Sequence, residues 1–239
     1  RSDQSSQWYN ERLSDARFFA SNKLISDYFK DYRKDGKNEG ADELNVLFRP
    51  FLNSWRYDRI LLFDRTGRLI FSSSADTLIS ESVLRPEIDY VTGSVDRIYA
   101  DFVYCRNSDR VYFDMTNSLR DKSGEIKGFI LMRSDPDKYL FPLIQSWPTP
   151  SRTSENLLLE AVNDSVVFIN RLRHFSVEPM QLRLSLRDKE ILAVKAVSSY
   201  SGFVNAPDYR NKRVLAYMNI IPSTHWIMVA KIDRIELFT

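Results

Sequence analysis

The chain has 239 residues, enough for one large domain or for two domains of about 100–120 residues each. Hydrophobic residues make up 43% of it, and its 15 Phe, 12 Tyr and 4 Trp can fill two modest cores, which excludes a disordered chain. The 34 basic and 32 acidic residues are mixed along the sequence, so no basic stripe of the kind that binds nucleic acid is present. Cys105 is the only cysteine, which excludes an intramolecular disulfide.

The first third of the chain predicts helices. One long helix is expected from Gln7 to Arg33, because apolar residues recur at three- and four-residue steps without Gly or Pro: Leu13, Ala16, Ala20, Leu24, Tyr28 and Tyr32. Such a helix would span roughly 40 Å, longer than one small domain needs. It would therefore either pack into one core or run alongside two modules. A second helix is expected from about Asp42 to Ser54.

A strand–turn–strand pattern follows at Ile60–Phe71, and its Asp64-x-x-Gly67 turn suits a type I turn that ends in a left-handed glycine. We then expect a short helix over 80–90 and strands over about 96–105, 110–119 and 126–134. Asp135-Pro136 predicts another helix start, with Asp as the cap and Pro in the first turn. The proline-rich residues 147–154 are read as a connector.

The same order of elements then returns. We expect a hairpin over 156–170, a helix over 188–197, strands over 200–205, 212–220 and 225–232, and the first turns of a helix from Asp233. Matching landmarks are 97 residues apart at Ile60 and Leu157, 103 apart at Val111 and Val214, and 98 apart at Asp135 and Asp233. Near-constant spacing predicts two copies of one small domain. We place the N-terminal helices in residues 1–55 and the two modules in 56–150 and 151–239.

This order of elements resembles the tandem Cache (double PAS-like) sensor domains, which are the extracytoplasmic parts of membrane-bound histidine kinases, chemoreceptors and cyclic-di-nucleotide enzymes. The resemblance covers nearly the whole chain. It is best at Arg59–Arg68 and Gly124–Leu131. Further runs resemble a subgroup that precedes PAS-containing sensor kinases: Tyr139–Ser151, Glu155–Leu158, Asn170–His174, Pro207–Arg210 and Trp226–Asp233.

The resemblance implies an α+β fold in which a long N-terminal helix precedes two PAS-like modules, each a central antiparallel sheet flanked by helices. It implies transmembrane helices just before residue 1 and just after residue 239, and therefore a periplasmic or extracellular domain of a bacterial or archaeal receptor. A histidine kinase is the receptor class that we expect. The resemblance also implies a homodimer, with Tyr9, Phe18 and Phe29 on the N-terminal helix as the residues to test, and a ligand in the first module.

Motifs of enzymes are missing from the sequence. It has no nucleophile elbow, zinc-protease motif or phosphate loop, and its two histidines, His174 and His225, lie far apart along the chain. A metal site built from them and Cys105 would need an unusual convergence. We therefore expect no catalysis, no metal and no cofactor in this segment.

The candidate ligand site comes from strand residues that alternate toward the sheet face covered by helices. In the first module these are Tyr99, Asp101, Tyr104, Arg106, Tyr112, Asp114 and Arg133, with Tyr90 and Arg85 as lid residues. Arg could bind a carboxylate and Asp an amine, which suits a small zwitterion or organic acid. In the second module the equivalent residues are Tyr200, Phe203, Asp208 and Tyr209.

Two alternatives remain open at this point. Asp114 and Arg133 can instead face water, as polar strand residues often do. The chain can also be an interaction module whose pockets are filled by its own side chains and which responds to a partner protein. Amino-acid specificity is not implied, because the Arg-aromatic-Tyr arrangement of amino-acid-binding tandem Cache proteins is matched only superficially, and at the wrong place, by Trp55-Arg56-Tyr57.

Overall fold

The computed structural model describes residues 2–35, 40–54, 56–75, 81–94, 97–147, 149–198 and 201–238. Its contacts divide the chain into two compact units. We call Glu11–Val103 with Tyr112–Asp135 the first module, and Arg1–Asn10, Tyr104–Val111 and Pro136–Thr239 the second module. Among the described residues, no helix is both long enough and apolar enough to cross a bilayer.

Three helices begin the chain: α1 (Ser2–Ala20), α2 (Lys23–Asp35) and α3 (Ala41–Asn53). The prediction of one continuous helix over Gln7–Arg33 was wrong, because the chain breaks at Ser21 and Asn22. The Ser21 hydroxyl donates to the carbonyl oxygens of Arg17 and Phe18, which ends α1. Asn22 Oδ1 then accepts the Leu24 N–H at 2.9 Å and so begins α2 as an N-cap. The first ten residues belong to the second module and the rest of α1 to the first, so one helix serves both.

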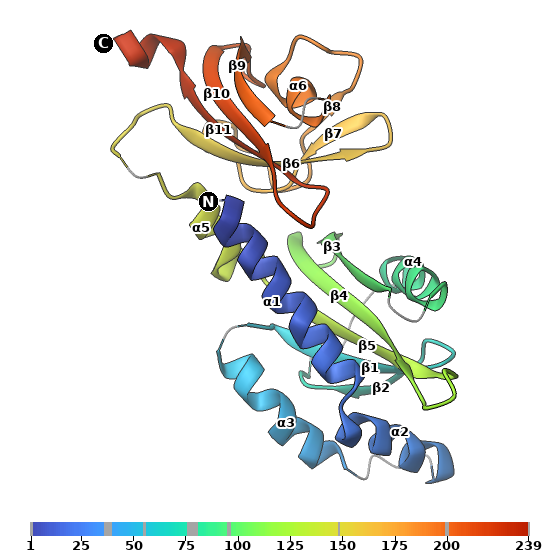
Figure 1. Cartoon of the computed structure of the whole chain (residues 1–239). Helices are drawn as coiled ribbons and strands as arrows, with labels where there is room; N and C mark the ends of the chain where they lie inside the picture. The colour runs from blue at the N-terminus through green and yellow to red at the C-terminus, as the bar shows by residue number, and fades with distance from the viewer. Residues whose placement is uncertain are drawn as a thin grey trace. The chain divides into compact units, whose positions relative to one another are not determined.

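The first module is built on a five-stranded antiparallel sheet (Figure 1). Its order is β2-β1-β5-β4-β3, formed by β1 (Arg59–Asp64), β2 (Leu69–Ser72), β3 (Ile98–Cys105), β4 (Arg110–Arg120) and β5 (Ile126–Ser134). The expected left-handed glycine is present at Gly67, with φ 85°, and Asp64 Oδ1 accepts the N–H groups of Thr66 and Arg68. Asp121 and Gly124 form the same kind of turn between β4 and β5.

Helices cover both faces of this sheet. On one face, α4 (Glu81–Thr92) packs Leu84, Ile88 and Val91 against apolar residues of β1 and β5. On the other, the α1–α3 helices pack through aromatic rings; Phe19 and Phe48 are 5.3 Å apart, and Tyr28 donates to the carbonyl of Ile70 at 3.1 Å. The face that α4 covers also carries the polar residues described below.

The second module repeats the plan. Its six-stranded antiparallel sheet has the order β8-β7-β6-β11-β10-β9, so it matches the first sheet strand for strand apart from the added edge strand β8. The strands are β6 (Glu155–Val162), β7 (Ser165–Phe168), β8 (Arg183–Ser185), β9 (Ser201–Pro207), β10 (Arg213–Ile220) and β11 (Ile227–Asp233). Helix α6 (Leu192–Ser198) packs on the face that carries Leu157, Leu159 and Val229, as α4 does in the first module. The predicted duplication is thus visible in the strand order.

Short helices lie at the ends of the second module. We predicted that Asp135-Pro136 begins an α-helix directly. Instead, a 3₁₀ turn η1 (Pro136–Lys138) comes first, and α5 (Leu140–Gln145) follows it. After β11 the chain forms a second 3₁₀ helix, η2 (Arg234–Phe238). In η2 the Glu236 carboxylate accepts the backbone N–H of Arg152 at 3.0 Å and that of Thr153 at 2.9 Å. These bonds hold the last described residues against the segment that leads into β6.

Candidate functional site

A buried ion pair lies on the α4 face of the first sheet. Asp114 on β4 and Arg133 on β5 are directly opposite each other in the ladder, and their side chains are 0% and 2% exposed. The guanidinium binds the carboxylate in bidentate fashion, with Arg133 Nε donating to Asp114 Oδ1 at 2.7 Å and Nη2 donating to Oδ2. The alternative in which these two residues face water is therefore wrong: the structure brings them together and buries both.

Tyr112 extends this cluster along β4. The Arg133 guanidinium lies 4.7 Å from the centre of the Tyr112 ring, and the guanidinium of Arg59 lies 5.9 Å from it. Arg59 is the register partner of Arg133, so two arginines meet across the β1–β5 ladder. Asp58 Oδ2 accepts from Arg59 Nε at 3.2 Å and from Nη2 at 3.1 Å. An aromatic face and a carboxylate thus offset the repulsion between the two cations.

Glu87 closes the cluster from the helix side. It projects from α4, is 1% exposed, and its Oε2 accepts the hydroxyl of Thr116, two residues beyond Asp114 on the same face of β4. Its other oxygen, Oε1, accepts no hydrogen bond from an N–H or O–H group of the described residues, and the Glu87 carboxyl shares a hydrogen bond with the Asp114 carboxylate. Burial, together with the nearby charge of Asp114, raises the pKa of Glu87 well above its ordinary value, although Thr116 and Arg133 oppose the shift. The raised pKa and the hydrogen bond between the two carboxyl groups favour the protonated form of Glu87, which donates to Asp114.

Sequence reasoning missed Glu87, although a signal for it was present. Leu84, Ile88 and Val91 follow the three- and four-residue spacing of a buried helix face, and Glu87 falls on that same face. An acidic residue on the apolar side of a helix rarely remains there without a partner or a function.

The remaining predicted residues of the first module are spread over its surface and edge. Tyr99 on β3 packs against the apolar cluster under α4 and meets Tyr90 edge-on at 6.1 Å. Asp101 Oδ1 accepts the N–H of Phe102 at 2.8 Å. Tyr104 lies in the hairpin tip 104–111, where its hydroxyl donates to Asp109, and this tip is grouped with the second module.

Both predicted lid residues lie on the exposed side of α4. Arg85 forms an ion pair with Asp89 at 3.2 Å, one turn along the helix, and both side chains are well exposed. Tyr90 is also exposed, and the guanidinium of Arg97 lies 5.2 Å from its ring centre. The inward side of the same helix carries Glu87 instead.

The second module carries a different charge cluster at the equivalent place. Lys231 on β11 is fully buried, and its Nζ lies 2.7 Å from Glu155 Oε2 and 2.8 Å from Asp208 Oδ2. Tyr209 donates to Glu155 Oε2 at 2.8 Å, and its ring centre lies 5.0 Å from Lys231 Nζ. Here both oxygens of the Glu155 carboxylate and both oxygens of the Asp208 carboxylate are bound by the module's own donors.

Arg210 completes that cluster. Its Nε donates to Asp208 Oδ2 at 2.7 Å, and its Nη2 donates to Asp233 at the end of β11. Burial alone would raise the pKa of Asp208, but hydrogen bonds from Arg210 and Lys231 outweigh burial and hold that pKa below its ordinary value. Of the other residues predicted in this module, Phe203 is exposed, and Tyr200 lies outside the described residues.

The run Asn170–His174, noted in the sequence for its resemblance, ties the start of β6 to the following loop. Asn170 Oδ1 accepts the N–H of Leu158 at 2.6 Å, and its Nδ2 donates to the carbonyl of Asn156 at 3.0 Å. The backbone N–H of Arg173 donates to Glu155 Oε1 at 2.6 Å. His174 Nε2 lies 3.3 Å from the carbonyl of Thr153. These residues therefore fix the backbone around Glu155.

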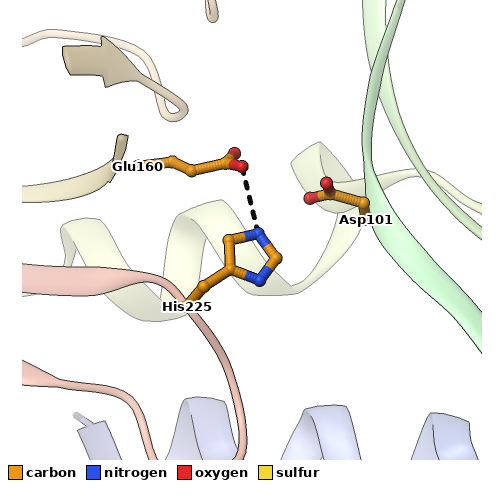
Figure 2. Close-up of side chains that lie close together, drawn as sticks. All are labelled: Asp101, Glu160 and His225. Atoms are coloured by element: carbon orange, nitrogen blue, oxygen red, sulfur yellow. Dashed lines mark ion pairs between the residues drawn. The ribbon is translucent and has the colours of Figure 1, made fainter. Parts of the chain in front are cut away.

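His225 lies beside a carboxylate of the same module. Its Nε2 is 3.0 Å from Glu160 Oε1, and its imidazole is about half exposed. Figure 2 marks this ion pair with a dashed line. The pair carries two opposite charges only when the imidazole is protonated. Both residues belong to the second module.

Comparisons with known proteins agree with this architecture. No protein-family model matches the chain, and no curated protein sequence matches it significantly. Solved structures do match over nearly its full length. The ligand-binding domain of the Pseudomonas fluorescens chemoreceptor CtaA, in complex with L-leucine, has a TM-score of 0.62 at 13% identity, covering 100% of this chain and 92% of that one.

Two further structures have slightly higher TM-scores. The periplasmic sensory domain of the Campylobacter jejuni chemoreceptor Tlp1 gives 0.67 at 12% identity and covers 99% of this chain and 92% of its own. An extracellular domain assigned to a histidine kinase, vpHK1S-Z8, gives 0.68 at 12% identity and covers 97% and 88%. The chain therefore has the tandem Cache sensor fold, as predicted from the order and spacing of its elements.

Proposed function

We propose that this chain is the extracytoplasmic sensor domain of a transmembrane signalling receptor and that its first module binds a small molecule bearing an ammonium group. The observation that carries the proposal is Glu87, a buried carboxyl group that α4 holds against Asp114 of the Asp114–Arg133 pair, so that two acidic side chains meet away from water. The site spans the inward face of α4 and strands β1, β4 and β5.

Charge is the physical reason for an ammonium ligand. The cluster holds three carboxyl groups, those of Asp58, Asp114 and Glu87, but only the two guanidinium groups of Arg59 and Arg133. An ammonium group that replaces the hydrogen bond between Glu87 and Asp114 would supply the third positive charge and donate up to three hydrogen bonds. Glu87 would then ionise, so binding would release one proton.

The structurally similar domains support this ligand class without fixing the compound. CtaA was solved with L-leucine, and the domain of Pseudomonas aeruginosa PctB was solved with L-Arg; both ligands carry an α-ammonium group. At 14% identity or less, these likenesses concern the fold, and the proposal for this chain rests on its own carboxyl groups. Amines that lack a carboxylate match the excess of carboxyl groups in this cluster as well as amino acids do.

We infer the receptor class from the same structural similarity. The similar domains belong to chemoreceptors and to proteins assigned as histidine kinases. We propose that this chain belongs to a histidine kinase, that transmembrane helices lie on both sides of it, and that it forms a homodimer. On α1, Phe18 is 48% exposed and suits a dimer contact, whereas Phe29 on α2 is buried under the first sheet. In such a receptor a ligand needs only to prefer one of two packings of α4 and the sheet.

A rival function is an interaction module that senses a partner protein. It is favoured by the direct pairing of Asp114 with Arg133, which fills part of the site with the module's own side chains. Thermal-shift screening separates the two proposals. We expect at least one amine or amino acid to stabilise the wild type by about 2.7 kcal/mol at 100 times its dissociation constant.

Matched variants make the screen specific. Glu87→Gln should abolish the shift, and Asp89→Asn, an exposed carboxyl on the same helix, should leave it intact. The ligand proposal is wrong if no amine, amino acid, organic acid or nucleobase stabilises the wild type, or if Glu87→Gln responds as the wild type does. The first of those outcomes would favour the interaction module.

A further inference from the structure

A polar cleft opens in the second module, next to Glu155 of the Lys231 cluster. Its volume is about 250 Å³, and its walls come from the end of α5, the start of β6 and the loop that follows β7. Cavities that hold drug-sized molecules begin at about 300 Å³, so this cleft admits a smaller ligand. The residues that matter here are Ser154, Arg173, Arg171 and Asn156.

Ser154 is the unusual member of the wall. It is 2% exposed, and its hydroxyl oxygen has no hydrogen-bond partner among the described residues. A buried hydroxyl without a partner is uncommon, because it has lost water without replacing the bond. The backbone does not need this hydroxyl: the Ser154 N–H donates to Ser151 Oγ at 3.0 Å, and the Ser154 carbonyl accepts from Arg173.

Arg173 provides a cation that is oriented in advance. Its Nη1 donates to the carbonyl of Ser154 at 2.8 Å, and its Nη2 donates to the carbonyl of Ser151 at 3.0 Å. These two bonds to the backbone fix the plane of the guanidinium. Three of its five N–H groups can still donate to a ligand. No carboxylate forms an ion pair with Arg173 within the part of the chain that the structure describes.

The acidic groups nearby are already occupied. Glu155, which also lines the cleft, is bound by Lys231 Nζ at 2.7 Å and by the hydroxyl of Tyr209. Arg171 forms a bidentate pair with Glu178, through bonds of 3.1 Å and 2.9 Å. Among the described residues of this cleft, the charged group without an oppositely charged partner is therefore the guanidinium of Arg173.

We infer that this cleft is a second ligand site, which takes a small oxyanion, either a carboxylate or a phosphate group. One oxygen would accept from the Arg173 guanidinium and another from the Ser154 hydroxyl, so that binding satisfies both groups at once. Asn156 fixes the floor, because its Nδ2 donates to the carbonyl of Ile144 at 2.6 Å. This site is independent of the ammonium site in the first module.

Amide chemical shifts of the complete 239-residue chain test the inference. Sodium phosphate and sodium acetate are titrated separately, with chloride keeping the ionic strength constant. We expect saturable shifts in the amides of 154–156 and 171–173 with at least one of the two anions, and the tighter of the two identifies the chemistry. Ser154→Ala should weaken that binding about tenfold or more, since it removes a hydrogen bond to a charged group.

Two more variants complete the test. Arg173→Gln should abolish binding, and Arg213→Gln, an exposed arginine on β10 of the same module, should bind as the wild type does. Arg173→Gln also removes two structural hydrogen bonds, whereas Ser154→Ala removes none. Without anion, Ser154→Ala should therefore be at least as stable to unfolding as the wild type, and its weaker binding then reports the lost hydroxyl group. The site is disproved if neither anion shifts these amides, or if Ser154→Ala and Arg173→Gln bind as tightly as the wild type.

Discussion

Arg133 in β5 and Lys231 in β11 occupy matching positions of the two sheets: each is paired across the ladder with the first residue of its module's first strand, Arg59 and Glu155 respectively. In the second module the cation therefore meets an anion, and Asp208 and Tyr209 complete its surroundings. In the first module a cation meets a cation, and the carboxylates of Asp58 and Asp114 match these two charges. Glu87 is a third carboxyl group beyond that balance.

Glu87→Gln should make the first module more stable at neutral pH. The pKa of Glu87 is raised in the folded state above its ordinary value of 4.5, so above pH 4.5 the unfolded chain loses a proton that the folded chain keeps. Wild-type stability then falls by about 1.4 kcal/mol per pH unit until Glu87 ionises in the folded state. Urea unfolding between pH 4 and pH 8 should show this slope in the wild type and in Asp89→Asn, and lose it in Glu87→Gln. Parallel curves for all three proteins would contradict the assignment.

Removing one member of the Asp114–Arg133 pair should be costly. Asp114→Leu leaves a buried guanidinium without its carboxylate, and we expect a loss of about 3–5 kcal/mol in the free energy of unfolding. Arg133→Met should cost a similar amount. The double variant Asp114→Leu/Arg133→Met should recover most of the loss, because both charges are gone. Additive losses in this cycle would mean that the two side chains do not depend on each other.

Lys231→Met should destabilise the second module by about 3–5 kcal/mol, since Glu155 and Asp208 lose their shared cation. The variant should also change the response to acid. The lowered pKa of Asp208 gives stability that is present above its ordinary pKa of 3.8 and is lost as pH falls through the folded value. Acid unfolding followed by circular dichroism should begin at a higher pH in Lys231→Met than in the wild type. Coinciding acid transitions would show that Lys231 does not support Asp208.

Gly128→Ala should destabilise the first module through packing alone. A Cβ atom at this position would lie 2.2 Å from the Phe29 ring of α2 and 2.3 Å from the carbonyl oxygen of Phe63. The ring can move but the strand backbone cannot, so we expect a loss of about 1–3 kcal/mol or more. Thermal unfolding measures it, and a variant as stable as the wild type would contradict the close approach of α2 to β5.

The fold could be predicted from the sequence because its signals are local and repeated. Alternating apolar residues mark the strands, and turns such as Asp64–Gly67 and Asp121–Gly124 hold their own backbone through the Asp side chain. The break between α1 and α2 was missed because Ser21 and Asn22 disturb the apolar stripe little, although their side chains compete for the backbone. The short strand β8 was missed because three residues are too few for a periodic pattern.

The site was harder to predict because it depends on pairing between distant strands. Asp114, Arg133 and Tyr112 lie on one face of the sheet, as alternation predicts, but alternation does not show that the first two bind each other. Arg85 and Glu87 are two residues apart on one helix and face opposite ways, and only the register of α4 against the sheet decides which is buried. That register is set by Leu84, Ile88 and Val91.

Isothermal titration calorimetry of the best-binding amine from the screen tests the central claim most directly. Titrations of the wild type near neutral pH, in buffers of different ionisation enthalpy, should show the release of about one proton per ligand, because the ammonium group converts the protonated Glu87 into a carboxylate. Glu87→Gln should show neither binding nor proton release. Binding without proton release, or equal affinity for Glu87→Gln, would contradict a ligand site at Glu87 and Asp114.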